Sequence, residues 1–336
     1  MRIDVHNHLL PEPYVDLLLQ WDTPVGLEAD GDRLYMVHRR SGTAGVAAGN
    51  RIPVNDGFTD VEARIEWMEE HDVDRTLVSV STPNPLDGTF TPTQSTRLIR
   101  AINDGYADLQ ARYPDHIAGL GMLPLRSPEA ALEELDRIAD DLMLAGIALP
   151  TSVDGTTLSS PELEPVFDRI DELDLTTFVH PHGNALSDEL GDDESFLNPL
   201  VVFPTETTFR IVRLIYDGFF DRHEFDVVLS HMGGALLQLA GRFERGRNEV
   251  DDPAARPDRP ILEYVERFHY DCISFHRPAL RAAIETVGVD QFVFGTDFPF
   301  DEEDTGTIVS DVEAVVPAES DRDRIMRSTA TDLFDL

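Results

Sequence analysis

The sequence contains no lysine, so all 27 of its basic residues are arginines. This absence excludes a mechanism through a Schiff base on a lysine side chain, and it excludes a pair of metal ions bridged by a carbamylated lysine. The single cysteine, Cys272, permits no disulfide within the chain and favours a reducing compartment. No apolar run reaches ~18 residues and no signal-like segment opens the chain. Together these absences predict a soluble cytoplasmic protein with no membrane partner.

Positive charge is scarce as well. The chain carries 64 acidic residues against 27 basic ones, a formal net charge of -37. Such a surface repels nucleic acid and anionic membranes, so we expect neither as a partner. The charges are interspersed with apolar runs from end to end, which favours a folded chain over a disordered one. This composition is typical of a halophilic protein, whose self-repulsion is screened in molar salt.

Eight short apolar runs alternate with amphipathic segments along the chain. The runs are apolar throughout, as in parallel strands that helices cover on both faces. Eight β/α units in 336 residues favour a (β/α)8 TIM barrel over an open doubly wound sheet. A dinucleotide-binding sheet would also show a glycine-rich turn after its first strand, where this chain has His-Asn-His. The predicted strands span 2–8, 75–81, 117–125, 146–150, 176–182, 226–233, 269–274 and 291–298.

Helices are predicted between these strands. Two of them open with Ser-Pro, at Ser127 and Ser160, which predicts an N-cap followed by proline in the first turn. The clearest candidates span 60–71, 93–113, 127–143, 160–173 and 208–221.

One segment, residues 20–58, interrupts the alternation between the first strand and its helix. "LEADGDRLYMVHRR" predicts a hairpin about Asp30-Gly31, and "SGTAGVAAGN" a loop of small residues. An insertion after a barrel strand lies at the catalytic face. Because ~40 residues are marginal as an independent unit, we expect one domain over 1–336, in which residues 20–58 form a small cap over the active site.

Histidines end three of the predicted strands. His6 and His8 end the first, and they project on the same side because they are two residues apart. His180 and His182 end the fifth, and His231 follows the sixth. A lone histidine is more often structural, but five of the eleven histidines fall at these three strand ends. A shared site at the barrel mouth is therefore favoured.

Asp297 ends the eighth strand and completes a set of ligands suited to a divalent ion such as zinc, manganese, iron or nickel. Because a carbamate bridge is excluded, the sequence favours one metal ion. His6, His8, His180 and Asp297 are the predicted ligands, and they leave a position for water or substrate.

The chain resembles the amidohydrolase superfamily, in the branch typified by aminocarboxymuconate-semialdehyde decarboxylase. The resemblance covers nearly the whole chain and depends on six motifs in order: "DVHNHLLP", "ARIEWMEEHDVDRTLVSVSTPNP", "YPDHIAGLGMLPL", "FVHPHG", "FPTETTFRIVRLIYDGFFDRHEFDVVLSHMGG" and "VFGTDFPF". It implies that the four predicted ligands bind zinc or a related metal and that His231 acts as acid/base beside it, with Asp297 as a second proton donor. It also implies a homodimer, for which the apolar stretch 197–220 is a candidate interface.

The substrate contacts depart from the branch pattern. The position of its carboxylate-binding arginine falls at Asn55, so Arg51, four residues earlier, is the predicted substitute, with Arg39 and Arg40 as weaker candidates. His182 stands where the decarboxylase has tryptophan, and it either contacts substrate or fills the strand end. Phe298, Pro299 and Phe300 either wall the pocket or pack as a turn, and His276 is a further pocket candidate.

Two functions remain open. The first is a mononuclear metal-dependent carboxy-lyase acting on a small unsaturated or aromatic carboxylate. The second is a hydrolase on the same scaffold that opens a lactone, amide or related bond. An arginine clamp favours the first, whereas an open, electrophile-sized space facing the metal favours the second. A degenerate barrel used only for binding is disfavoured, because the full set of metal-binding residues is present.

Overall fold

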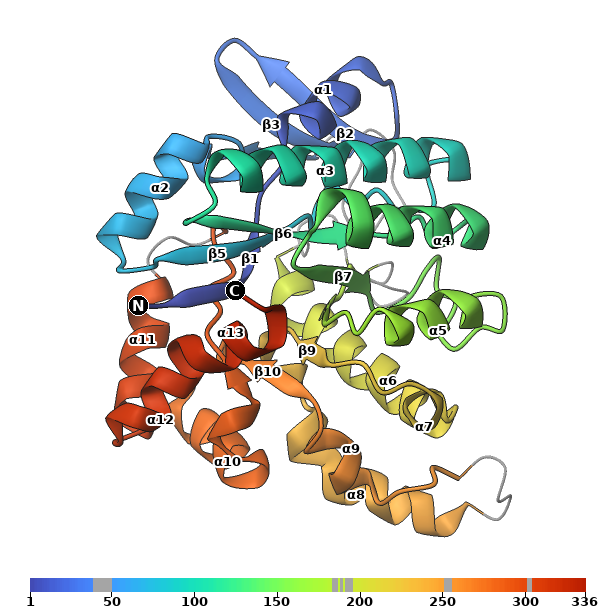
Figure 1. The fold of residues 1–336 in the computed structure, drawn as a ribbon, viewed down its shortest axis with the longest axis vertical. Helices are drawn as coiled ribbons and strands as arrows, with labels where there is room; N and C mark the ends of the chain where they lie inside the picture. The colour runs from blue at the N-terminus through green and yellow to red at the C-terminus, as the bar shows by residue number, and fades with distance from the viewer. Residues whose placement is uncertain (39–49, 183–186, 188–189, 191–195, 251–255, 301–303) are drawn as a thin grey trace.

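Eight parallel strands form the sheet at the centre of the molecule (Figure 1). The computed structural model describes residues 1–38, 50–182, 187, 190, 196–250, 256–300 and 304–336. These eight strands pair in chain order, while the three strands between the first and second of them form a separate sheet, which confirms the predicted barrel. Their bounds are β1 Ile3–His8, β5 Arg75–Ser79, β6 Ile117–Met122, β7 Gly146–Pro150, β8 Thr177–His180, β9 Val227–Leu229, β10 His269–Asp271 and β11 Phe292–Val293.

The barrel closes where its last strand meets its first. The Val5 amide donates to the Phe294 carbonyl at 3.0 Å, and the Asp297 amide donates to the His6 carbonyl at 2.7 Å. β11 is much shorter than the predicted strand 291–298, because the chain bends at its end to reach β1. This closure brings the tip of the eighth strand against the two histidines of the first.

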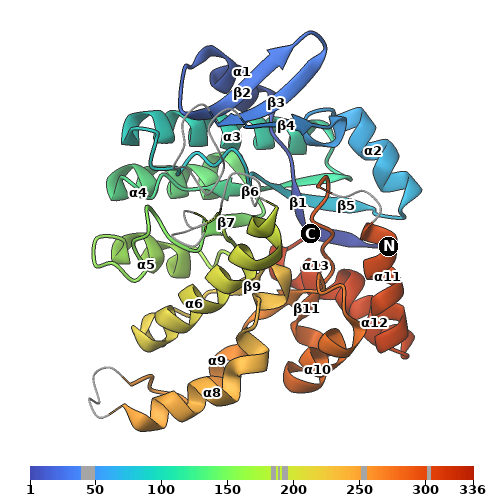
Figure 2. The same ribbon diagram turned by 180° about the vertical axis from the view of Figure 1, so that it is seen from behind.

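Helices surround the barrel in Figures 1 and 2. The bounds are α1 Glu12–Gln20, α2 Val61–Glu70, α3 Pro92–Arg112, α4 Pro128–Arg137, α5 Glu164–Glu172, α6 Phe203–Tyr216, α7 Phe219–Arg222, α8 Leu236–Glu249, α9 Ile261–Val265, α10 Arg277–Val287, α11 Asp304–Val315, α12 Glu319–Asp323 and α13 Thr329–Phe334. In the part of the chain that the structure describes, no helix is both long and apolar enough to cross a bilayer.

The helix starts agree only partly with the Ser-Pro signals. Ser127 occupies the N-cap position of α4 with proline directly after it, although its hydroxyl makes no capping hydrogen bond. The predicted N-cap at Ser160 is wrong. Turn residues follow it, and α5 begins at Glu164, where Pro165 takes the first-turn position instead. The predicted helix 208–221 is two helices, α6 and α7, because Gly218 turns the chain with φ +67°.

The predicted insertion, residues 20–58, follows α1 and contains a separate three-stranded sheet, named the cap sheet below, with strands β2 Val25–Asp30, β3 Arg33–His38 and β4 Asn50–Val54. β2 and β3 pair antiparallel, with Asp30 opposite Arg33, which confirms the hairpin about Asp30-Gly31. The sheet lies beside α1 at one edge of the molecule, seen at the top of both ribbon views. Arg39, Arg40 and most of the small-residue loop lie outside the described residues.

Candidate metal centre

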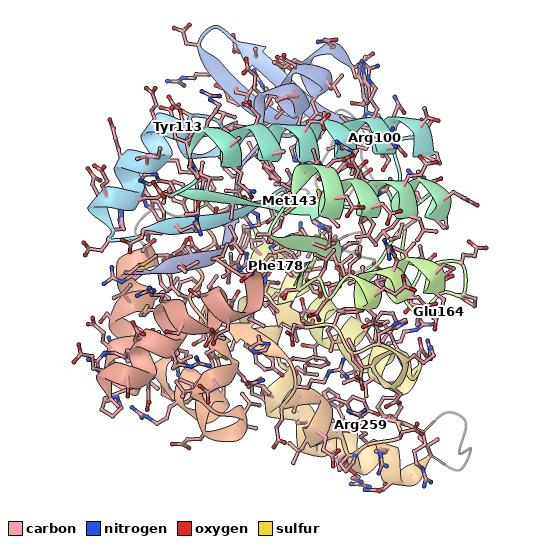
Figure 3. The ribbon with its side chains drawn as sticks, in the orientation of Figure 1. Arg100, Tyr113, Met143, Glu164, Phe178 and Arg259 are labelled. Atoms are coloured by element: carbon pink, nitrogen blue, oxygen red, sulfur yellow. The ribbon has the colours of Figure 1, made fainter. Side chains whose placement is uncertain are left out.

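Four histidines meet at the carboxyl ends of the strands. His6 and His8 come from β1, His180 ends β8, and His231 follows β9. The His6 ring centroid lies 5.2 Å from that of His8, 5.1 Å from that of His180 and 4.9 Å from that of His231. Phe178, labelled near the middle of the molecule in Figure 3, has its ring centroid 5.0 Å from that of His6. The structure thus brings together side chains from three strands distant in sequence.

Asp297 joins these histidines through both carboxylate oxygens. Its Oδ1 lies 3.0 Å from His8 Nε2 and 3.3 Å from His6 Nε2, while its Oδ2 lies 3.6 Å from His231 Nε2. Two predicted ligands, His6 and His8, and the predicted acid/base residue His231 therefore share one carboxylate, and a ligand atom of His180 lies within 4.8 Å of it.

Hydrogen bonds to β1 hold the turn that carries Asp297. Asp297 has a left-handed backbone, φ +63°, which is uncommon outside glycine. The Thr296 hydroxyl donates to Asp4 Oδ2 at 2.7 Å and accepts from the Phe298 amide at 3.1 Å. Because Asp4 lies on β1, these bonds hold the Asp297 turn in register with His6 and His8.

The chemistry of these donors fits a divalent metal. Among the described residues, buried His6 Nε2 and His180 Nδ1 make no hydrogen bond, and His6 Nε2 has only its 3.3 Å charge contact with Asp297 Oδ1. Unsatisfied polar atoms are costly in a protein interior, so their concentration here points to a group that these atoms bind. His6, His180, His231 and Asp297 each offer a ligand atom within 4.8 Å of the others, and His8 touches Asp297 beside them. Imidazole nitrogens with one carboxylate suit zinc, manganese or iron.

Electrostatics divide the residues of the centre by charge. Burial would lower the pKa of His6, but the Asp297 and Asp271 carboxylates outweigh it and raise that pKa to about 10. Burial lowers the pKa of His8, and burial and neighbouring imidazoles hold the pKa of His180 well below its usual value. Burial would raise the pKa of Asp297, but His6, with hydrogen bonds from His231 and His8, holds it well below its ordinary range. Asp297 is therefore an anion.

Metal affinity should rise with pH. A metal held by His6 would need the neutral form of this imidazole, so binding would have to displace the His6 proton, whose pKa is raised to about 10. Below about pH 10 the proton competes with the metal for His6. When binding releases one proton, the apparent metal affinity rises about tenfold for each unit by which the pH increases. We expect the apparent Zn2+ affinity, measured by chelator competition, to increase about tenfold per unit from pH 6 to 8. A flat profile would contradict this assignment.

The remaining predicted contacts differ in where they lie. The His182 ring centroid is 5.6 Å from that of His180, and burial, with repulsion from His8, lowers the His182 pKa to about 4, so this ring is neutral beside the centre. Asn55 donates to the Pro299 carbonyl at 2.7 Å and thereby joins the insertion to the Asp297 turn. His276 is exposed at the start of α10.

Arg51 lies on the cap sheet. Its guanidinium is 3.0 Å from Glu28 and 3.4 Å from Asp30, and it stacks on Tyr35 with 4.1 Å to the ring centroid. Its side chain is 38% exposed. The polar partners that the structure gives Arg51 are thus acidic residues of the same sheet, and they already satisfy the charge that was predicted to grip substrate.

A second arginine near the insertion was not predicted. Arg64, on α2, is fully buried and donates to Asn7 Oδ1 at 2.8 Å and to the carbonyls of Gly57 and His8. Its guanidinium carbon lies 4.8 Å from the Phe298 ring centroid. Arg64 therefore stabilises β1 by hydrogen bonds and the Asp297 turn by its contact with Phe298.

Aromatic side chains border the centre on the Asp297 side. The Phe300 ring centroid is 5.5 Å from that of His8 and 5.1 Å from that of Phe58, and Phe300 is half exposed. Phe298 is buried and stacks on Trp67 at 3.7 Å. Phe298 therefore packs as part of the turn, whereas Phe300 faces both the histidines and solvent.

The chain belongs to the amidohydrolase family, Amidohydro_2, which it matches over residues 3–336. It is 28% identical over 305 residues to the 2-amino-3-carboxymuconate-6-semialdehyde decarboxylase of Dictyostelium discoideum, covering 89% of this chain and 82% of that one. It is 30% identical over 288 residues to the gamma-resorcylate decarboxylase of Rhizobium radiobacter, covering 82% and 87%. The predicted resemblance to decarboxylases of this superfamily is confirmed.

Solved structures agree with this assignment. A 2,6-dihydroxybenzoate decarboxylase complexed with 2,6-dihydroxybenzoate superposes with a TM-score of 0.77 at 25% identity, covering 100% of this chain and 99% of that one. A dihydroxybenzoic acid decarboxylase of Polaromonas sp. JS666, with bound manganese and the inhibitor 2-nitroresorcinol, gives 0.76 at 23%, covering 100% and 97%. These matches over whole chains confirm the barrel fold.

Proposed function

We propose that the protein is a metal-dependent decarboxylase that removes CO2 from a small aromatic or unsaturated carboxylate. The observation that carries this proposal is the meeting of four histidines and Asp297 at one barrel mouth, in a chain whose relatives are decarboxylases of two such acid types. We propose His6, His8, His180 and Asp297 as the ligands of one divalent ion.

The residues of the chain have separate tasks in this reaction. A divalent metal held by these residues would supply a Lewis acid for the substrate oxygens and the developing negative charge. The bond between the substrate carbon and its carboxylate breaks, its electron pair stays on carbon, CO2 leaves, and the carbon takes a proton. The low pKa of Asp297 keeps this residue ionised, which favours His231 as the proton donor. His231 Nε2 lies 3.6 Å from Asp297 and so borders the space that substrate would enter.

Substrate recognition is proposed to depend on the aromatic border. Phe300 offers a half-exposed ring beside His8, which suits a planar aromatic or conjugated substrate. Neutral His182 is proposed to hydrogen-bond a substrate oxygen, because its ring lies 5.6 Å from that of His180 and its buried Nδ1 has no hydrogen-bond partner among the described residues. Asn55 and Arg51 remain predicted substrate contacts. Each would have to leave its present partner, Pro299 for Asn55 and the pair Glu28 and Asp30 for Arg51.

The hydrolase alternative has one supporting observation. In the part of the chain described, Arg51 is paired within the cap sheet and Asn55 takes the arginine position, so no carboxylate clamp is formed by either residue. A hydrolase needs no such clamp. The two functions differ in their product, since only a decarboxylase releases CO2.

A panel of substrates separates them. We expect the Zn2+- or Mn2+-loaded protein, assayed in molar KCl, to release CO2 from at least one member of a set of hydroxybenzoates and muconate-type acids. Chelation should abolish the release and added metal should restore it. The same protein should leave matched lactones and amides intact. Hydrolysis of these lactones or amides without CO2 release from any acid would reject the decarboxylase in favour of the hydrolase.

A homodimer is also proposed. Phe196, Leu200, Val201 and Phe209 are each more than half exposed, and all four lie in a short segment at the start of α6. Exposed apolar side chains concentrated in this way are typical of an interface. Sedimentation velocity should give a dimer, and Leu200→Glu should shift it toward monomer.

We also propose that zinc is the resident metal and that the protein is located in the cytoplasm.

Salt should stabilise the protein. The net charge of -37 makes the folded chain repel itself, and molar salt shortens the screening length to about 3 Å. We expect the thermal midpoint to rise by roughly 10 °C, on the order of 7 kcal/mol of stability for a chain of 336 residues, between 0.1 and 2 M KCl. Calorimetry at both concentrations measures it. A midpoint that is higher in dilute buffer would refute the halophilic interpretation.

A further inference from the structure

Asp271 is a buried carboxylate that receives four hydrogen bonds at the end of β10. Its side chain is fully buried. Oδ2 lies 2.7 Å from His6 Nδ1 and accepts from the His231 amide at 2.7 Å. Oδ1 accepts from the Met232 amide at 2.7 Å and from the Ile273 amide at 3.1 Å. One side chain therefore touches a proposed metal ligand and the backbone of the proposed acid/base residue.

The first contact fixes which nitrogen of His6 is free. An ionised carboxylate only accepts, so His6 Nδ1 carries the proton, and the lone pair of the neutral ring is on Nε2. His6 Nε2 faces Asp297 Oδ1 at 3.3 Å and has no other partner among the described residues. Asp271 thus orients the ring and selects the tautomer that a metal requires.

The second contact fixes the backbone that presents His231. His231 and Met232 are both left-handed, with φ +52° and φ +54°, a conformation that side chains with a Cβ rarely adopt. Their two consecutive amides point to the two oxygens of Asp271, which holds the turn in this conformation. Without that acceptor the turn would relax and the imidazole of His231 would leave its place beside Asp297.

We propose that Asp271 is a positioning residue that couples the metal centre to the proton donor, holding His6 in its metal-binding tautomer and His231 in its working place. Asp271 contacts neither substrate nor the reacting atoms in this scheme. The kinetic part of the inference rests on the proposed decarboxylation, whereas the metal-binding part stands without it.

Asp271→Asn tests this proposal well, because it keeps the shape of the side chain but replaces one hydrogen-bond acceptor by a donor. If the amide nitrogen takes the place of Oδ2, it faces two N–H groups, and His6 has to move its proton to Nε2, which blocks metal binding. If the amide nitrogen takes the place of Oδ1, it faces the amides of Met232 and Ile273, and the turn at His231 and Met232 is released. The first orientation is favoured, because His6 can change its tautomer and accept a hydrogen bond whereas backbone N–H groups cannot. In that orientation the His231 amide loses its acceptor as well, so both functions are weakened.

The experiment compares Asp271→Asn with Asp311→Asn, a matched loss of a largely buried carboxylate that pairs with Arg277 on the outer helices. Zn2+ affinity is measured by chelator competition, and kcat and KM at saturating metal. We expect Asp271→Asn to bind Zn2+ about 10- to 100-fold more weakly, and its kcat at saturating Zn2+ to fall by a similar factor with little change in KM. Asp311→Asn should match the wild type in both.

A spectroscopic measurement covers the case in which the variant does not fold. In the Zn2+-loaded wild type, two-bond 1H–15N correlation should show His6 protonated at Nδ1, in slow exchange, and bound through Nε2. Coordination through Nδ1, or an Asp271→Asn protein with Zn2+ affinity within threefold of the wild type, would overturn the proposal. Both measurements need only zinc, so an absence of CO2 release from the acid panel would reject the proposed function and leave this test intact.

Discussion

Replacing His231 by glutamine is expected to lower kcat about a thousandfold while the protein keeps its metal. Glutamine fills a similar volume and can donate an N–H toward Asp297, but it carries no proton that it can give to carbon. General acid catalysis by a positioned side chain contributes about 10²- to 10⁴-fold, which sets the expected loss. The measurement is CO2 release at saturating substrate, with metal content determined on the same sample.

The control is His116→Gln, at the start of β6 and thus at the opposite end of the barrel from the centre. It should match the wild type in turnover and in metal content. His231 Nε2 lies close enough to Asp297 and the other imidazoles to ligate a metal, so metal content decides between its two roles. Loss of metal from His231→Gln would make His231 a ligand, and unchanged turnover would remove it from catalysis.

The barrel could be predicted because each strand is a short apolar run with marked ends. Gly146 and Pro150 bound β7 where the sequence predicts its limits, since both residues interrupt regular structure. The eighth strand was predicted too long. Its apolar pattern continues to Phe298, but the chain bends at Thr296 and Asp297 to close on β1, and that bend depends on a tertiary bond to the His6 carbonyl.

That the candidate ligands lie together could be predicted for a related reason. The carboxyl ends of all strands of a barrel lie at the same face of the molecule. Residues at these strand ends could therefore be assigned to one site: His6, His8, His180, His231 and Asp297. Local pattern does not fix side-chain partners across the fold. Arg51 is four residues from the predicted arginine position, yet the hairpin register places Glu28 and Asp30 within its reach.

The role of Asp271 could not be predicted from its position at the end of a strand alone. This residue too ends a strand, in "HYDCIS", but an aspartate there has many structural uses. Its role depends on β10 lying beside β9 and on His6 reaching across the barrel, so it emerges only from the packing of three strands. The same holds for Arg64, which was hidden inside an ordinary amphipathic helix.

Gly234→Ala is expected to lower the free energy of unfolding by roughly 3 kcal/mol, because two independent costs of ~1–3 kcal/mol each apply at this site. Gly234 has φ +65° and ψ -120°, a region essentially restricted to glycine. A Cβ there would also lie 2.1 Å from the Pro204 carbonyl oxygen and 2.6 Å from Thr208 Oγ1, at the start of α6. Backbone on one side and a hydrogen-bonded hydroxyl on the other leave little room to relax.

The same substitution a few residues later provides the control. Gly241 lies inside α8, and a Cβ there meets no atom within 4 Å, so Gly241→Ala should stabilise the protein by about 0.5–1 kcal/mol through helix propensity. Denaturant unfolding in molar KCl measures both variants, and equal midpoints would contradict the argument. Because Gly234 follows His231 within one turn, Gly234→Ala should also lower kcat in the fraction that folds, whereas Gly241→Ala should leave kcat unchanged. A stability loss with full kcat would show that this turn supports the fold without positioning the proton donor.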